Sequence, residues 1–193
     1  MNISREDAAA ALASVESADR RMDTLRGYRY MAPYLQLWGA VWFIANLVED
    51  HWPARANAAW LAGILIGCAG TAVLVVMQAR TRTRLGLTSP ERSRRRSLGF
   101  ALLGLTVLAY FIAMGVVVGP LDPRQANAFI SLFWALGYMA VGSWLGMRLF
   151  LTGLITVIAI MVGYLYVHDH FALWMAFFGG GSLLLGGLWL RRP

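Results

Sequence analysis

The sequence predicts an all-α integral membrane protein: a six-transmembrane-helix bundle of three helical hairpins, preceded by an N-terminal amphipathic helix. Of the 193 residues, 59% are hydrophobic and only 14% are charged, whereas a soluble domain is about a quarter charged and less than half apolar. Six apolar stretches also approach the roughly 20 residues that a helix needs to cross a bilayer. The arginines, finally, gather on one side of these stretches, which orients them.

Residues 1–29 form the first element, which we expect to be a cytoplasmic amphipathic helix. Ser4, followed three residues later by Asp7, is a capping-box signal for a helix start. Apolar residues then recur at spacings of three and four, on one side of a helix: Ala8, Ala11, Val15, Ala18, Met22 and Leu25. Such a stripe suits a partner-binding or self-associating helix, or a helix that rests on the bilayer surface or on the bundle.

Residues 30–193 form the predicted membrane domain with its six spans. These are Met31–Val48, Ala58–Gln78, Leu98–Gly119, Ala126–Met147, Leu149–Val167 and Phe171–Leu190. None contains Asp, Glu, Arg or His. Because backbone groups cannot stay unpaired in lipid, the spans should be helices. Pro33 stands at the entry to the first span, where it suits a first helical turn.

The distribution of the 17 arginines predicts the orientation. If the N-terminus is cytoplasmic, all of them except Arg55 and Arg124 fall on the inner side. This positive-inside bias places both termini in the cytoplasm. The first 30 residues also lack the continuous apolar core of a cleavable signal peptide. We therefore expect a multi-pass protein of the bacterial inner membrane.

The cytoplasmic loop at residues 79–97 is the most basic part of the chain. Ser89-Pro90-Glu91 within it is typical of a helix start, with proline at the first helical position. The helix that follows should carry four arginines to the membrane surface: Arg92, Arg94, Arg95 and Arg96. We expect them to contact anionic lipid headgroups, at about 1 kcal/mol for each arginine near the surface. No aromatic residues interleave with the arginines, so nucleic acid is not an expected partner.

Small residues recur at helix-packing spacing within the spans. Three G-x-x-x-G pairs are present: Gly63 with Gly67, Gly115 with Gly119, and Gly142 with Gly146. Helices in lipid associate through such close backbone approach, here either inside the bundle or between copies of the chain. The glycines of Gly179–Gly187 also allow a second interpretation, a flexible or broken sixth helix around a substrate.

Two segments show a faint internal echo. The run PARANAAW (Pro53–Trp60) resembles PRQANAF (Pro123–Phe129), and both precede an apolar span. Duplication of a helical hairpin would produce this pattern. Independent selection for polar turns ahead of apolar helices would produce it as well, so the question of true repeats stays open at this point.

Composition excludes several kinds of chemistry. The chain has no lysine, which excludes a lysine Schiff base, and its single cysteine, Cys68, excludes an internal disulfide or a thiol pair. Proton- and cation-coupled carriers usually keep an ionisable residue at depth, and the predicted spans have none. No cofactor is predicted.

Histidines and carboxylates gather in the outer loops. His51, His168, Asp169, His170 and Asp50 are the right ligand types for zinc or another divalent metal. His168 and His170 are two residues apart, however, and would point about 200° from each other in a helix. Asp169 is also well placed to cap the sixth helix. We therefore expect polar turns here and retain the metal site as the alternative.

These observations favour a non-enzymatic accessory or regulatory membrane subunit that acts through helix–helix and cytoplasmic contacts. Its expected partners are the lipid bilayer, anionic lipids, and either further copies of itself or another membrane protein. A small oligomeric channel or facilitator for a small solute is the alternative. A membrane enzyme or sensor that uses the outer His/Asp cluster is a further one.

Overall fold

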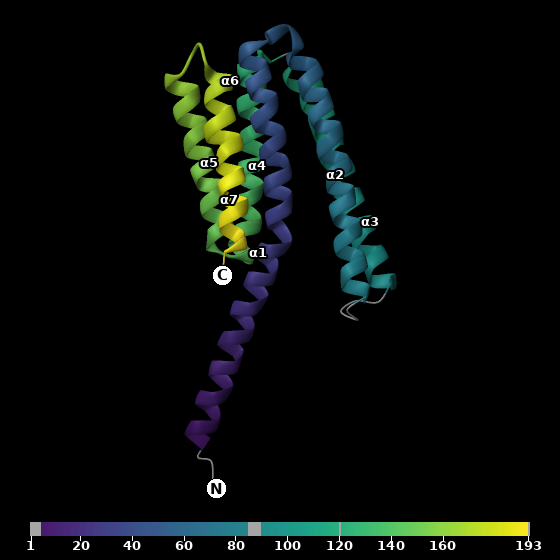
Figure 1. Cartoon of the computed structure of the whole chain (residues 1–193), viewed down its shortest axis with the longest axis vertical. Helices are drawn as coiled ribbons and strands as arrows, with labels where there is room; N and C mark the ends of the chain where they lie inside the picture. The colour runs from purple at the N-terminus through teal and green to yellow at the C-terminus, as the bar shows by residue number, and fades with distance from the viewer. Residues whose placement is uncertain (1–4, 85–89, 120, 193) are drawn as a thin grey trace.

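A computed structural model describes the backbone of residues 5–84, 90–119 and 121–192 (Figure 1). Side chains are described for residues 12, 14–16, 18, 22, 24–82, 84, 102, 105–119 and 121–192. The described chain is almost entirely helical and contains no strand. Its elements are α1 (Arg5–His51), η1 (Pro53–Arg55), α2 (Ala56–Arg84), α3 (Pro90–Val118), α4 (Pro123–Leu145), α5 (Met147–Tyr166), α6 (Phe171–Trp174), the π-helical η2 (Met175–Gly180) and α7 (Gly181–Arg191).

Five helical segments of the described chain are long and apolar enough to cross a membrane, as expected of a multi-pass membrane protein. They are Thr24–His51, Pro53–Arg82, Pro123–Leu145, Met147–Tyr166 and Phe171–Arg191. The remaining predicted span, Leu98–Gly119, coincides with part of α3, where the described apolar segment is the shorter Leu105–Val118. The start of that predicted span lies partly outside the described side chains.

The first helix runs without a break through the predicted boundary at residues 29 and 30. α1 is 47 residues long and contains Pro33 in its interior, so the expectation that Pro33 opens a span is wrong. A proline removes one backbone N–H bond, and the helix continues past that gap. The part of α1 before Thr24, residues 5–23, is called the N-terminal extension below. It projects beyond the bundle (Figure 1).

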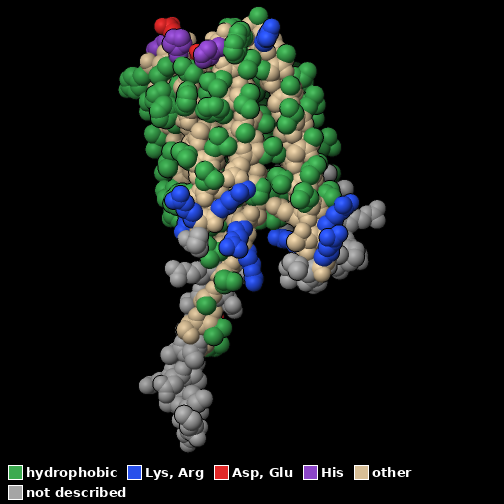
Figure 2. Space-filling model, in the orientation of Figure 1, with side chains coloured by type: hydrophobic (Ala, Val, Ile, Leu, Met, Phe, Trp, Pro, Cys, Tyr) green, Lys and Arg blue, Asp and Glu red, His purple; other side chains and the backbone are tan. Residues whose placement is uncertain are grey.

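The two ends of the molecule differ in charge (Figure 2). One end holds the links from α1 to α2, from α3 to α4 and from α5 to α6; it carries the histidines and is called the His/Asp end. The opposite end, the arginine end, holds the C-terminus and the short turn between α4 and α5. Among described side chains, only Arg55 and Arg124 place arginine at the His/Asp end.

The helices form two regions of unequal packing. α1, α4, α5 and the α6–η2–α7 segment pack against one another, and we call them the inner bundle. Its buried hydrophobic side chains lie in two clusters. The first comprises Val41, Trp42, Ala128, Ala135, Ile160, Phe171 and Met175, and the second Tyr28, Ala32, Leu35, Leu149 and Leu190. α2 and α3, the lateral pair, lie to one side (Figure 1), where α2 packs on α1.

The α6–η2–α7 segment packs into the inner bundle through glycines. A Cβ on Gly180 would lie 2.6 Å from the backbone nitrogen of Phe43, so η2 and α1 are in backbone contact. A Cβ on Gly187 would lie 2.7 Å from Gln36 Cγ on α1, and one on Gly186 would lie 2.5 Å from Thr152 Cγ2 on α5. The glycine-rich segment is therefore a helix with a π-helical turn at Met175–Gly180, and it stays helical through Arg191.

The predicted glycine pairs have different surroundings. Gly63 and Gly67 face Val41 and Trp38 of α1, and a Cβ on Gly142 would lie 2.3 Å from the Phe150 nitrogen of α5. Gly146 is the turn between α4 and α5, where its φ of +137° favours glycine. The predicted span Ala126–Met147 is thus α4, which ends at Leu145, and Met147 already belongs to α5.

The remaining pair, Gly115 and Gly119, does not pack. A Cβ on either residue would meet no described atom within 4 Å. Within the described part of the chain this pair therefore forms no helix interface, and an interface between copies of the chain stays a prediction. Gly119, with a φ of +79°, follows the last residue of α3 instead.

Candidate functional site at the His/Asp end

A polar network joins three helices just below the His/Asp end. Asn127 on α4 donates a hydrogen bond from Nδ2 to Asn46 Oδ1 on α1, at 2.7 Å, and a longer one to Glu49 Oε2, at 3.4 Å. The same carboxylate oxygen accepts a 2.7 Å hydrogen bond from Trp60 Nε1 on α2. Glu49 therefore connects the lateral pair to the inner bundle through hydrogen bonds.

The amides of this network are buried and have further partners. Asn46 is 0% exposed and donates from Nδ2 to the carbonyl of Trp42, at 2.8 Å. Ser131, one turn along α4, donates to the carbonyl of Asn127 at 2.6 Å. A buried amide without such partners would destabilise the fold, because nothing in lipid replaces the lost hydrogen bonds. The network therefore fixes how α1 and α4 face each other.

Asp50, which follows Glu49 on α1, caps the start of α6. Its Oδ1 accepts a hydrogen bond from the backbone nitrogen of Leu173, at 3.3 Å, in the first turn of α6. Its other oxygen lies 3.4 Å from His170 Nδ1 and 3.9 Å from His51 Nδ1. The expectation that Asp169 caps this helix is wrong: His170 occupies the N-cap position, and no cap bond comes from its side chain.

Arg124 anchors the start of α4 to α5 and α6. Its Nη2 donates to the backbone carbonyl of Tyr164. The guanidinium also lies over two rings, 4.8 Å from the centroid of Tyr164 and 5.4 Å from that of Phe171. Just before it, Asp122 accepts a 2.8 Å hydrogen bond from the Gln125 nitrogen and so caps α4. The arginine thus holds three elements together through one side chain.

The histidines do not form a metal site among the described residues. His170 is 71% exposed and meets Asp50, which is 9% exposed, while His168 and Asp169 are exposed in the turn before α6. No group of three His, Cys, Asp or Glu side chains within the described chain could hold a metal ion. The connection is not helical at His168, so the geometry of the turn differs from the helical one considered above.

The arginine end has a smaller set of contacts. Arg148 donates from Nη1 to the carbonyl of Arg192 at 2.7 Å, and its guanidinium lies 5.8 Å from the centroid of the Tyr28 ring. These contacts join α5 to α1 and to the C-terminal residues. The four arginines expected to contact lipid headgroups, Arg92, Arg94, Arg95 and Arg96, lie outside the described side chains.

Sequence reasoning missed Asn127 and the anchoring role of Arg124. Both lie in the PRQANAF run, whose likeness to PARANAAW was the available signal. The two asparagines of the echo have different surroundings, however, because Asn127 is buried between helices and Asn57 is exposed at the start of α2. Similar sequences at the start of two helices therefore do not place their asparagines in equivalent surroundings.

Comparison of the chain with family models, with curated proteins and with solved structures gives no match. Its chemistry must therefore be judged from the site itself. Carboxylates, amides, imidazoles and a guanidinium meet here, and each hydrogen bond described above runs from one helix to another or within one helix. The arrangement fixes helices against one another.

Proposed function

We propose that this chain is a non-enzymatic accessory or regulatory subunit of a bacterial inner membrane, with six spans and both termini in the cytoplasm. In this proposal the six-span domain is the membrane anchor. The N-terminal extension of α1 is the surface on which a partner protein binds. The strong segregation of arginine to one end supports the orientation, since arginine is retained on the cytoplasmic side of bacterial membranes.

The observation that carries the proposal is the apolar side of the N-terminal extension. Leu12, Val15 and Met22 are 62%, 56% and 50% exposed, and α1 is continuous from this surface into the core of the inner bundle. A helix outside the membrane gains nothing from exposed leucine, valine and methionine unless another surface covers them. A partner protein with a hydrophobic groove would cover them, because an amphipathic helix can lay its apolar side into such a groove.

The packing of the inner bundle counts against the channel alternative. The sixth span touches α1 through Gly180 and Gly187 and α5 through Gly186. The contacts with α1 are at backbone distance and the contact with α5 is to the Thr152 side chain, so these helices leave no passage between them at these positions. A conducting pathway would have to form elsewhere, between copies of the chain.

The proposal is tested by purification of the full chain from its native membrane in mild detergent, followed by native mass measurement. We expect a complex larger than one chain. The double variant Val15→Glu with Met22→Glu should lose that complex, because two carboxylates then stand in the apolar contact. Circular dichroism should show unchanged helix content.

The matched control places the same two carboxylates on the opposite side of the helix. By the 3.6-residue period, Ala13 and Ser17 lie opposite the apolar side that carries Leu12, Val15 and Met22, so Ala13→Glu with Ser17→Glu should retain the complex. Loss of the complex in both double variants, or a single chain in the unaltered protein, would contradict the proposal. Solute flux through liposomes that contain this protein alone would establish the channel alternative instead.

A further inference from the structure

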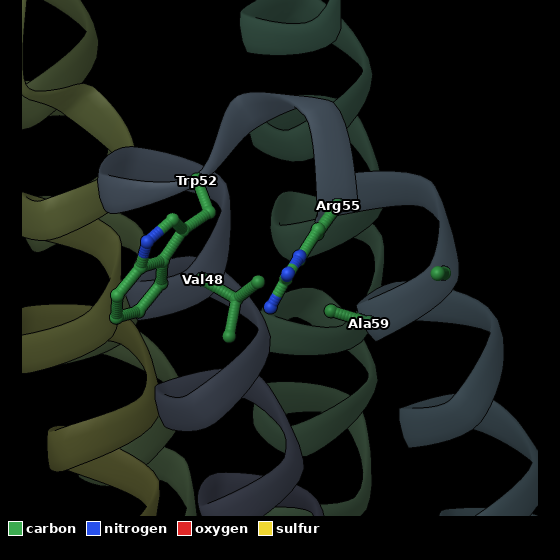
Figure 3. Close-up of a pocket in the computed structure, with 5 residues that line it drawn as sticks. Val48, Trp52, Arg55 and Ala59 are labelled. Carbon is green, nitrogen blue, oxygen red and sulfur yellow. The ribbon is translucent and has the colours of Figure 1, made fainter.

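A hollow of about 340 Å³ lies beside the link between α1 and α2 (Figure 3). It is lined by Val48 and Trp52 at the end of α1, by Arg55 of η1, and by Ala58 and Ala59 of α2. Apart from the guanidinium, the lining side chains are hydrophobic. Figure 3 shows the guanidinium of Arg55 directed from η1 toward Val48 and Ala59. A cation is thus held above an apolar surface.

Arg55 differs from the other arginine at this end of the molecule. Arg124 donates to a backbone carbonyl and lies over two aromatic rings. The Arg55 backbone nitrogen donates to the Trp52 carbonyl at 2.8 Å. Its side chain is exposed and makes no hydrogen bond, ion pair or ring contact to any other described residue. Arg55 and Arg124 are thus the described arginines that lie at the His/Asp end. Among described residues, only Arg124 has contacts that account for its position there.

The hollow lies at the end of two apolar segments that are long enough to cross a membrane, Thr24–His51 and Pro53–Arg82. Trp52, at its rim, is 58% exposed, and an exposed tryptophan at the end of a span is typical of the membrane interface. One turn further along α2, Leu61 and Leu65 are exposed and lie within the apolar segment. An arginine at this depth is stable when it meets water or an anion, and the anion available along the whole surface is lipid phosphate.

We propose that this hollow binds the phosphate group of an anionic phospholipid, with Arg55 as the hydrogen-bond donor. Arginine suits this group because its planar N–H fork matches two phosphate oxygens. Val48 and Ala59 then contact the first methylenes of an acyl chain, and Trp52 packs at headgroup level. A lipid is favoured over a free phosphate ion because the hollow is apolar and a bilayer supplies its lipids at high local concentration.

The proposal requires only that the link between α1 and α2 lies at a membrane surface. It makes no use of the N-terminal extension, so failure of one proposal leaves the other standing.

The test measures lipid binding by the full chain with Arg55 changed to glutamine. The protein is placed in nanodiscs of phosphatidylcholine with one-fifth phosphatidylglycerol, released, and examined by native mass spectrometry. We expect Arg55→Gln to lower phosphatidylglycerol retention at the tightest site about fivefold. This corresponds to about 1 kcal/mol for one arginine at the surface. Because the basic loop also binds anionic lipid, the comparison is repeated with Arg92, Arg94, Arg95 and Arg96 changed to glutamine, where the difference should persist.

Two further variants separate a site from general charge. Arg191→Gln removes an exposed arginine at the opposite end and should leave the tightest site occupied. Ala59→Leu keeps every charge but fills the hollow, and it should lower retention as Arg55→Gln does. Equal retention in Arg55→Gln and the unaltered protein would overturn the proposal, and so would equal losses in Arg55→Gln and Arg191→Gln. Displacement of the lipid by millimolar inorganic phosphate would show that the occupant is a small phosphate instead.

Discussion

The inner bundle and the lateral pair both contain apolar helices, but these helices are packed very differently. Within the apolar window of the segment Phe171–Arg191, 44% is buried inside the protein, compared with 6% for Pro53–Arg82, which includes α2. α2 is nevertheless the more hydrophobic of the two. In a membrane, therefore, the most apolar helix is not the most buried one, because lipid solvates apolar side chains as well as a protein core does.

Small residues distinguish the central helix instead. Gly180 and Gly187 let the α6–η2–α7 segment approach α1 at backbone distance, and Gly186 lets it pack on the Thr152 side chain of α5. α2 has glycines as well, but they are confined to its α1 side, and large apolar side chains such as Leu65 and Val73 cover the rest. The comparison predicts that the inner bundle depends on shape and on a few polar contacts, whereas much of the lateral pair needs only to be apolar.

The largest effect should come from a side chain placed at the closest backbone contact. Gly180→Leu would put a Cβ 2.6 Å from the Phe43 nitrogen and 2.9 Å from the Gly39 carbonyl oxygen. We expect a loss of about 3 kcal/mol in unfolding free energy, or failure to accumulate. Gly115→Leu in α3 is the matched control and should change stability by about 0.5 kcal/mol at most, because a Cβ there meets no described atom. Thermal unfolding in detergent measures both, and equal losses would remove the distinction between the two regions.

A smaller effect should follow from loss of the amide that joins α1 to α4. Asn127→Leu removes the donor to Asn46 and to Glu49 while keeping a side chain of similar size. We expect a loss of about 1 kcal/mol, the usual size of a hydrogen bond between helices in a membrane. Asn57→Leu, at the echo position on α2, should have no measurable effect because Asn57 is exposed. If the two variants unfold alike, the buried network does not contribute to stability.

The smallest effect should be local to the start of α6. Asp50→Ala removes the acceptor for the Leu173 nitrogen, and loss of an N-terminal cap typically costs about 1 kcal/mol or less. Amide hydrogen exchange at Leu173 should become faster, and thermal stability should fall slightly. Asp169→Ala should leave the exchange rate at Leu173 unchanged, since Asp169 makes no cap bond in the structure. If Asp169→Ala increases the exchange rate at Leu173 more than Asp50→Ala does, Asp169 is the cap, as the sequence predicts.

The sequence predicts the helical character of the chain and most of its membrane-crossing segments well. The Ser-Pro-Glu pattern also places the start of α3 at Pro90, as observed. These features depend on local chemistry: apolar length, proline geometry and the absence of charge. The sequence did not predict the continuity of α1. A proline such as Pro33 fits the first turn of a helix and is also found inside a longer one, and the neighbouring residues do not distinguish the two cases.

The candidate site was predicted only as a list of polar residues in the loops. Asp50 was expected as a possible metal ligand, whereas it caps a helix that begins 121 positions later in the chain, at Phe171. Asn127 was not singled out, because nothing in its neighbours reveals that Asn46 will lie opposite. Contacts of this kind depend on which helices become neighbours, and spacing along one helix carries no information about that choice.

The π-helical turn at Met175–Gly180 makes the sixth span sensitive to its own length. A π turn contains one residue more than the α-helical turn it replaces, and one residue rotates everything beyond it by about 100°. Trp174, before the turn, donates to the Ala159 carbonyl of α5, and Gly187, after it, lies against Gln36 of α1. Deletion of one residue between Trp174 and Gly187 would restore a regular helix. The glycines beyond the deletion would then rotate away from α1. The number of residues in this segment therefore matters as much as their identity, because it determines which side of the helix meets α1.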